Sequence, residues 1–184
     1  ISVGNVDAAI SAVGIADLGY DGIGIDNVAE SSRAPSNPDV RWAYAMDGIS
    51  LVATTNSSSD ASSVSVGWTS GALSMVVAHN SDGNTGGVTN NAASVSTSVG
   101  GMSVAVMVAD SSTASIGSSQ GMAVSMPMDG LGTVTFVLAD SHSDTDASYG
   151  VGFSKSLGGG ATLAGGYGTA DGVAVGDLGI SFSF

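Results

Sequence analysis

The chain of 184 residues contains no cysteine, which excludes disulfide staples and thiolate metal sites. It has only three basic residues against 16 acids, and this net charge of −13 argues against nucleic acid as a partner. Hydrophobic residues make up 43% of the chain, yet no apolar run approaches the ~20 residues that a membrane-spanning helix needs. A closed β-barrel is the other structure that can cross a membrane, because its strands pair all their backbone polar groups.

From Val40 to Phe184 the chain repeats a unit of roughly ten residues in which apolar side chains alternate with small or polar ones. The short breaks between units are Asp47-Gly48, Ser70-Gly71, Gly100-Gly101, Asp129-Gly130 and Leu157-Gly160. The longer polar breaks are Asn56-Ser62, Asn80-Asn90, Ser111-Ser119, Asp140-Asp146 and Thr169-Val173. This layout predicts an all-β fold, an antiparallel up-and-down transmembrane β-barrel, with one face of each strand toward lipid and the other toward water.

The side-chain pattern can be followed across each turn, because the residues that flank a two-residue hairpin point to the same face. The apolar set from Val64 to Trp68 continues across Ser70-Gly71 on Leu73 and every second residue after it. Most other turns pass the same test. Counting Ile1-Gly4 as the end of a strand, residues 1–184 form a single partial barrel domain of 11 to 12 strands, with eleven consecutive antiparallel strands in residues 38–184.

One turn breaks this pattern. After Asp129-Gly130 the apolar set resumes one residue late, on Val134, which predicts a three-residue turn or a bulge around Leu131. Pro127 falls on the inward side of its strand, where it has no N–H to donate to a ladder, and it predicts a local irregularity near this turn.

The few aromatic residues, 5% of the chain, fall near the ends of the predicted strands. One group lies toward the short turns and consists of Trp68, Phe153, Phe182 and Phe184. Tyr149 and Tyr167 lie toward the long loops. This distribution predicts two aromatic girdles at the membrane interfaces, although aromatic residues are also enriched in strands of any kind.

Residues 5–37 interrupt the hairpin pattern. The stretch around Ala8 predicts one or two helical turns, and later glycines, from Gly14 onward, prevent a long helix. A long loop within a compact barrel is usually functional, so we predict that residues 5–37 fold inward as a constriction loop. The candidate residues of the pore constriction are the charged residues of this loop and one on the strand that follows: Asp7, Asp17, Asp21, Asp26, Glu30, Arg33 and Arg41.

Acids on an inward loop that face a basic wall residue would set up a field across a narrow passage, and this field would select solutes by charge and dipole. The alternative is a surface loop on the outside of the cell, on which the same acids only keep the protein soluble.

Three stretches near the C-terminus have a recognisable layout. They are Tyr149-Gly150-Val151-Gly152-Phe153, then Leu157-Gly158-Gly159-Gly160-Ala161 with Gly165-Gly166, and Asp177-Leu178-Gly179-Ile180-Ser181-Phe182-Ser183-Phe184. They resemble the closing hairpin and last strand of alphaproteobacterial general diffusion porins. Gly4-Asn5-Val6-Asp7-Ala8-Ala9 resembles the entry into the constriction loop of that family, and the strand after Pro38 resembles the one that follows this loop.

The resemblance implies a sixteen-stranded trimeric barrel whose third loop folds inward and sets acids against basic wall residues. It also implies that the present chain lacks the first four strands and most of the fifth. The chain departs from the family pattern in having only three basic residues, which reduces the basic wall cluster to Arg41 with Arg33.

Some members of that family bind calcium. Asp17, Asp21 and Asp26 offer the oxygen ligands that calcium prefers, although their spacing is not that of a twelve-residue calcium loop. We therefore expect no required cofactor and keep calcium at these aspartates as an alternative. His79 and His142 lie in no spacing typical of a nucleophile or of zinc, so no enzymatic activity is predicted.

Together these observations predict an integral outer-membrane porin of a Gram-negative bacterium, a water-filled channel for passive transport of small hydrophilic solutes and ions that prefers cations. The expected partners are membrane lipid, lipopolysaccharide and further copies of the chain in a homotrimer. Two alternatives stay open. A complete twelve-stranded barrel, such as a secretion translocator or an oligosaccharide channel, would need Ile1-Gly4 to be a full strand. A surface adhesin would use the serine- and asparagine-rich loops and keep its lumen closed.

Overall fold

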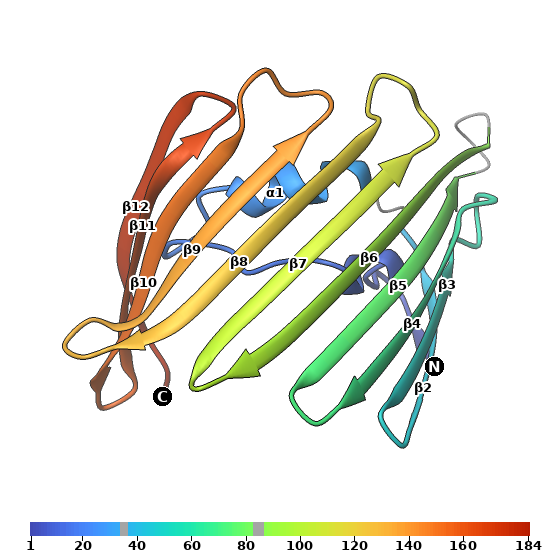
Figure 1. The fold of residues 1–184 in the computed structure, drawn as a ribbon. Coiled ribbons are helices and arrows are strands. Elements are labelled where there is room, and N and C mark those ends of the chain that lie inside the picture. The colour runs from blue at the N-terminus through green and yellow to red at the C-terminus, as the bar shows by residue number, and fades with distance from the viewer. Residues whose placement is uncertain (34–36, 83–86) are drawn as a thin grey trace.

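The computed structural model describes residues 1–33, 37–82 and 87–184. Parts of two predicted loops, residues 5–37 and Asn80-Asn90, therefore lie outside the described residues. The main element is one antiparallel sheet of 12 strands in which each strand pairs with its neighbours in the sequence (Figure 1). The predicted all-β, up-and-down architecture is confirmed.

The strands are β1 Ser2–Val3, β2 Val40–Met46, β3 Ile49–Thr55, β4 Ser62–Ser70, β5 Leu73–Asp82, β6 Val88–Val99, β7 Met102–Ser111, β8 Ser118–Met128, β9 Gly132–Ser141, β10 Ser148–Gly158, β11 Ala161–Ala170 and β12 Val173–Phe182. Between β1 and β2 lie the short helices η1 Ala9–Ala12, α1 Ile25–Glu30 and η2 Ser31–Arg33. In the described part of the chain, no helix combines the length and the apolar character that crossing a membrane requires.

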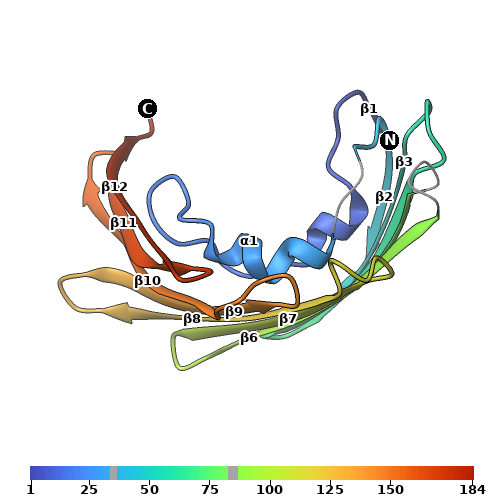
Figure 2. The same ribbon diagram turned by 90° about the horizontal axis from the view of Figure 1, so that it is seen from above.

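The sheet is bent into an arc, and residues 5–33 lie on its concave side (Figure 2). Directly paired residues share a face, so the register shows how the apolar set runs from strand to strand. Val66 of β4 pairs with Leu51 of β3 and with Val77 of β5. Trp68 in the same set is 43% exposed, and Leu138 of β9 is 53% exposed. The predicted apolar face is therefore the convex face of the arc, on which bulky side chains have no protein cover.

The twelve strands form an open arc and not a closed ring. β1 pairs with β2, β12 pairs with β11, and no pairing between β1 and β12 is present in residues 1–33, 37–82 and 87–184. β1 itself is two residues long. The described strands therefore do not form the closed twelve-stranded barrel that was the main alternative, because the edge strands β1 and β12 do not meet.

The turn between β8 and β9 has the predicted three residues. Met128 pairs with Gly132, so Asp129, Gly130 and Leu131 lie between the strands, and the Leu131 N–H donates to the Met128 carbonyl at 3.1 Å. The irregularity predicted at Pro127 is absent from this hairpin, where the register with β9 is continuous. β7 pairs with β8 only as far as Ser125, so a proline two residues later interrupts no ladder on that side.

The last connection is shorter than predicted. β11 runs to Ala170 and β12 starts at Val173, so the polar break expected over Thr169-Val173 is the two-residue turn Asp171-Gly172. Both turn residues have positive φ, 45° and 74°, which is the conformation of a type I′ hairpin. Asp47-Gly48 has the same signs of φ, 49° and 79°, and joins β2 to β3.

We expect the length of the β8–β9 turn to decide which side chains of β9 lie on the convex face. Deleting Leu131 shifts the following strand by one residue and moves the apolar set that starts at Val134 to the concave face, because the side-chain period of a strand is two. The variant should fail to form a folded barrel, as measured by circular dichroism and by electrophoretic mobility without heating. Leu131→Ser keeps the turn length and should fold as the native chain does; equal folding of both variants would contradict this account of the turn.

Candidate functional site

Residues 5–33, here called the inner segment, cross the concave side of the arc from β2 to β12 (Figure 2). Its side chains Ile10, Val13 and Ile25 are completely buried. The wall residues beneath it that share this core are small or slender: Ala78, Ala92, Met107, Ala109, Ala123, Val137 and Ala139. The inward face of each strand was expected to face water, but under the inner segment these wall residues are buried, because their small side chains leave room that the segment fills.

The start of η1 is held by two hydroxyl groups of the wall. The Ala9 N–H donates to Thr54 Oγ1 at 3.1 Å, and the Ile10 N–H donates to Ser63 Oγ at 2.8 Å. The first amides of a helix have no acceptor within the helix, so these inward hydroxyls supply one. Of the one or two helical turns predicted around Ala8, one is present as η1.

A third hydroxyl holds the end of α1. Ser119 Oγ on β8 donates to the Ala29 carbonyl at 2.5 Å and accepts from the Ser32 N–H at 3.3 Å. Gly121, two residues along the same strand, allows the close approach, because a Cβ there would lie 2.7 Å from Ile15 Cδ1.

An acid on the last strand holds the far end of the inner segment. Asp177 Oδ2 on β12 accepts from the Tyr20 N–H at 2.8 Å and from the Asp21 N–H at 2.7 Å. Glycines of β10 and β11 leave room for the same part of the segment. A Cβ at Gly152 would lie 3.1 Å from Leu18 Cδ2, and a Cβ at Gly166 would lie 3.0 Å from the Gly19 nitrogen.

Arg33 is used inside the segment. Its guanidinium forms an ion pair with Glu30 and donates to the carbonyls of Val13 and, at 3.2 Å, Ser11, so it ties η2 to the chain that follows η1. Burial lowers the pKa of Arg33 and raises that of Glu30, and the attraction between the two charges opposes both shifts. Arg33 therefore lies on the same side as the acids and does not face them from the wall as predicted.

Asp17 and Asp26 form a pair of carboxyl groups. Burial raises the pKa of Asp26 from 3.8 to about 6, and the negative charge of Asp17 and a side-chain hydrogen bond with Asp17 add to the shift. Asp26 Oδ1 is buried and has no hydrogen-bond partner among the described residues. A proton on Asp26 removes its buried charge and lets the two carboxyl groups share a hydrogen bond, so both effects raise its pKa, burial the more.

Asp7 and Arg41 lie at the other end of the segment. Both line a cavity of about 230 Å³ between the start of η1 and strands β2 and β3, together with Ser11 and Val52. Arg41 pairs with Thr54, whose hydroxyl holds η1, so the arginine is on the concave face as predicted.

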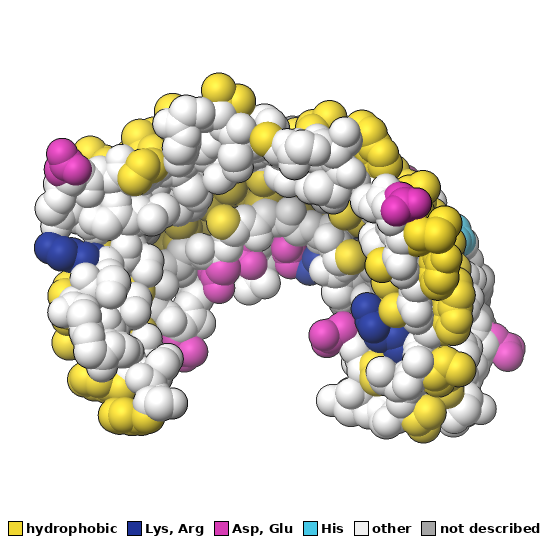
Figure 3. Space-filling view, turned by 90° about the horizontal axis from the view of Figure 1, so that it is seen from below, with side chains coloured by type: hydrophobic (Ala, Val, Ile, Leu, Met, Phe, Trp, Pro, Cys, Tyr) yellow, Lys and Arg dark blue, Asp and Glu magenta, His cyan; other side chains and the backbone are white. Residues whose placement is uncertain are grey.

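The structure thus divides the predicted constriction residues into groups. Asp17, Asp26, Glu30 and Arg33 lie together, and Asp7 and Arg41 share a cavity. The backbone of Asp21 is hydrogen-bonded to Asp177 on β12. Figure 3 shows acidic side chains gathered on the inner side of the arc. Within the described parts of the chain, no three His, Cys, Asp or Glu side chains lie close enough to hold a metal ion. Asp17, Asp21 and Asp26 do not form the calcium ligand set that was considered, and calcium stays a prediction.

Sequence reasoning missed the wall residues that hold the segment. They are Thr54, Ser63, Ser119 and Asp177. The sequence marks these four residues only by their position, because each falls on the inward side of its strand. Hydroxyl groups are common on that side of every strand, so this signal does not single out these four.

The predicted girdle aromatics lie on the convex face or at its edge. Tyr149 and Tyr167 are 56% and 66% exposed, and Trp68 pairs with Ile49 and Met75. Phe153 is half-buried, while Phe182 and Phe184 stack with ring centres 6.3 Å apart. A stacked pair that the sequence analysis did not assign, Trp42 and Tyr44, has ring centres 6.2 Å apart. That these rings contact a membrane interface stays a prediction.

Comparison with known proteins gives a match in structure but not in sequence. No protein-family model matches the chain. No curated protein matches it either. Among solved structures, a variant of the porin of Rh. blastica is 18% identical with a TM-score of 0.77, over 99% of this chain and 72% of the porin chain. A triple mutant of Rhodopseudomonas blastica porin is 19% identical with the same TM-score and coverage.

A third structure, described by the words "asymmetric conductivity of engineered proteins", is 19% identical with a TM-score of 0.78, again over 99% of this chain and 72% of that one. At such low identity a match establishes the fold and not the function. The chain has the fold of a bacterial porin, which confirms the fold expected from the resemblance of its two ends.

Removing the carboxyl group of Asp177 should loosen the attachment of the inner segment to β12. Asp177→Ala deprives the Tyr20 and Asp21 amides of their acceptor, so both should exchange with deuterium roughly tenfold faster, as expected for a lost hydrogen bond to a charged group. Hydrogen exchange resolved at these residues measures the effect. Asp60→Ala removes an acid from an outer loop and serves as the control; unchanged exchange in Asp177→Ala would show that the segment is held elsewhere.

The Asp26 carboxyl group should titrate near pH 6, as followed by its side-chain carbon resonance. Its folded pKa is above the ordinary 3.8, so the folded state binds the proton more tightly, and the docked segment should lose stability as the pH rises from about 4 to about 6. Asp17→Asn removes the neighbouring charge and should lower the midpoint. Asp21→Asn is the control, and a midpoint near 4 in the native chain would contradict the pairing.

Proposed function

We propose that this chain forms the wall and the constriction of an outer-membrane porin, through which small hydrophilic solutes and ions diffuse passively. One observation carries the proposal. A sheet with the porin fold exposes its bulky apolar side chains on the convex face and holds an acidic, inward-folded segment on the concave face. The two faces differ because residues alternate along every strand.

The convex face supports contact with hydrocarbon. Rows of valine, methionine and leucine cross the sheet in register, as from Val106 through Met122 and Leu138 to Tyr149. In water such a continuous apolar surface would favour aggregation, whereas a lipid bilayer covers it at no cost in backbone hydrogen bonds.

The concave face supports an aqueous passage that favours cations. Five acids of the inner segment and Asp177 of β12 lie on this side, and of the two bases there Arg33 is neutralised by Glu30. Arg41 remains as the base that faces the acids. The local excess of negative charge raises the concentration of cations at the passage and lowers that of anions.

The proposal includes no enzymatic activity and no required cofactor, because passive diffusion through a fixed passage makes and breaks no bonds. Calcium at Asp17, Asp21 and Asp26 stays an option of the proposal, although these three side chains form no cluster among the described residues that could hold a metal ion. Contact with lipopolysaccharide at the long loops and assembly as a homotrimer are further parts of it.

Neutralising Asp17 and Asp21 together, as Asp17→Asn/Asp21→Asn, should lower the cation-to-anion permeability ratio by about twofold, because both acids lie on the concave side. The reversal potential across a planar bilayer with a salt gradient measures this ratio.

Asp60→Asn/Asp129→Asn removes the same charge from two outer connections and is the matched control. Equal ratios for both double variants would place the acids of the inner segment away from the ion path. A native chain that enters bilayers without conducting would favour the closed adhesin barrel.

A further inference from the structure

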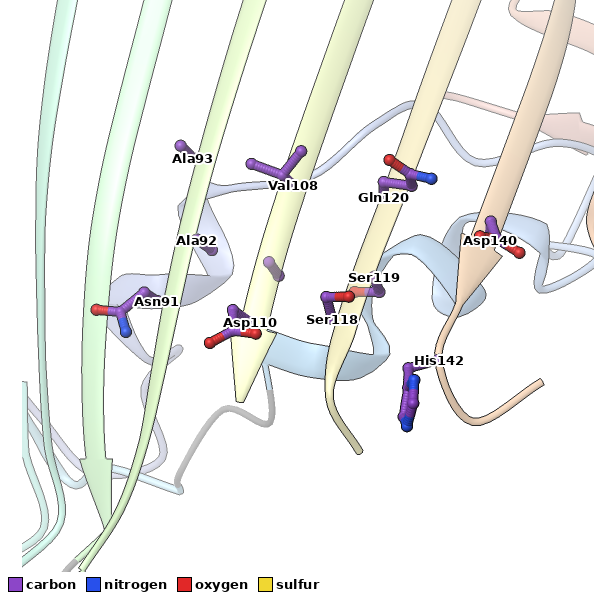
Figure 4. Close-up of a pocket in the computed structure, with 11 residues that line it drawn as sticks. Asn91, Ala92, Ala93, Val108, Asp110, Ser118, Ser119, Gln120, Asp140 and His142 are labelled. Atoms are coloured by element: carbon purple, nitrogen blue, oxygen red, sulfur yellow. The ribbon is translucent and has the colours of Figure 1, made fainter. Parts of the chain in front are cut away.

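Two adjoining cavities form one groove on the convex face, between β6 and β10 and close to the long loops. Their volumes are about 560 Å³ and 430 Å³, and Val108, Gln120 and Asp140 line both. Figure 4 shows the cavity nearer to the loops, with its side chains contributed by neighbouring strands. The groove faces the surroundings of the barrel and has no part in the passage proposed above.

The polarity of the groove changes from one row of paired residues to the next. The row nearest to the loops is polar and contains Asn91, Asp110 and Ser118, with His142 beside them. The next row is mixed, with Ala93 and Val108 followed by Gln120 and Asp140.

The third row is apolar and runs from Val106 through Met122 and Leu138 to Tyr149. A groove that is polar at one end and apolar at the other fits an amphiphile that lies along the strands.

The charge of the polar end selects among amphiphiles. Asp110 and Asp140 are exposed carboxyl groups, and no lysine or arginine accompanies them, since Arg33 and Arg41 belong to the concave side and Lys155 Nζ donates to the Gly130 carbonyl at the short-turn end. The imidazole of His142 lines the same cavity. Two carboxylates without a cation attract a positive group and repel a phosphate that carries no counter-charge.

We infer that this groove binds a membrane lipid whose head group carries a protonated primary amine. The amine lies between Asp110 and Asp140 with Gln120 as a further acceptor, and an acyl chain follows Val106, Met122 and Leu138 toward the middle of the membrane. This inference rests on the proposed function in one respect, that the convex face is in a membrane.

The test uses the full chain in nanodiscs that contain equal amounts of phosphatidylethanolamine and phosphatidylcholine with the same acyl chains. Phosphatidylethanolamine has a primary amine and phosphatidylcholine does not, so the retained lipid, measured by native mass spectrometry after detergent release, reports on the amine alone. We expect about fivefold enrichment of phosphatidylethanolamine on the native chain, in line with two exposed charge contacts. Asp110→Asn/Asp140→Asn should reduce the enrichment to about onefold.

Two variants complete the test. Asp60→Asn/Asp129→Asn changes the net charge equally outside the groove and should retain the enrichment. Ala93→Trp fills the groove without changing its charge and should reduce retention of both lipids. Equal enrichment in the native chain and in Asp110→Asn/Asp140→Asn would overturn the inference.

Other occupants give other results. Enrichment of an anionic lipid that is lost when divalent cations are chelated would replace the amine with a bridging cation and overturn the proposal. Disulfide cross-linking between copies that carry Gln120→Cys would do the same, because a second copy would then cover the groove. A chain that retains the amine lipid but conducts no ions would refute the channel and leave the lipid site standing, whereas a chain that does not enter the nanodisc would refute both.

Discussion

The structure depends on one constraint, that successive side chains of a strand point to opposite faces and that paired residues keep this choice across the whole sheet. The apolar set passes from Leu51 through Val66 to Val77 and onward in register to the last hairpin. Where a short connection would shift it, an extra residue restores the parity: Leu131 in the β8–β9 turn, and a bulge between Ser156 and Gly158 at the end of β10. Since the apolar convex face, the concave face and the groove between β6 and β10 are all defined by this parity, each of them would be lost if it failed in one strand.

The inner segment uses the concave face in a different way. It buries Ile10 and Ile25 against alanines and glycines of the wall, while wall hydroxyls and Asp177 take up backbone amides that the short helices leave unpaired. Apolar burial thus supplies the adhesion, and the polar groups set the position of the segment. Because the apolar side chains face the wall, the acids Asp17 and Asp21 are left exposed on the open side of the segment.

Charge is distributed unevenly between the two faces. On the concave side, Arg33 is bound within the segment, so the acids prevail even where bases are near. On the convex side of the described strands, the acids Asp110 and Asp140 lie beyond the apolar rows, toward the long loops. A chain with three bases therefore keeps an excess of acids on the concave side and at the loop end of the convex face, while Lys155 lies at the short-turn end of the convex face.

The sequence by itself determined the strands, the face on which Val66 or Leu138 lies, the odd turn at Leu131 and the single helical turn at η1, because all of these follow from local periodicity and turn chemistry. It did not determine that Arg33 would bind Glu30, that Asp26 would pair with Asp17, or that Ser63, Ser119 and Asp177 would hold the segment. Those contacts join residues up to 157 positions apart. Every strand offers similar small and polar side chains to the concave side. Which of them meet is therefore decided only by the curvature of the sheet and by the path of the inner segment across it.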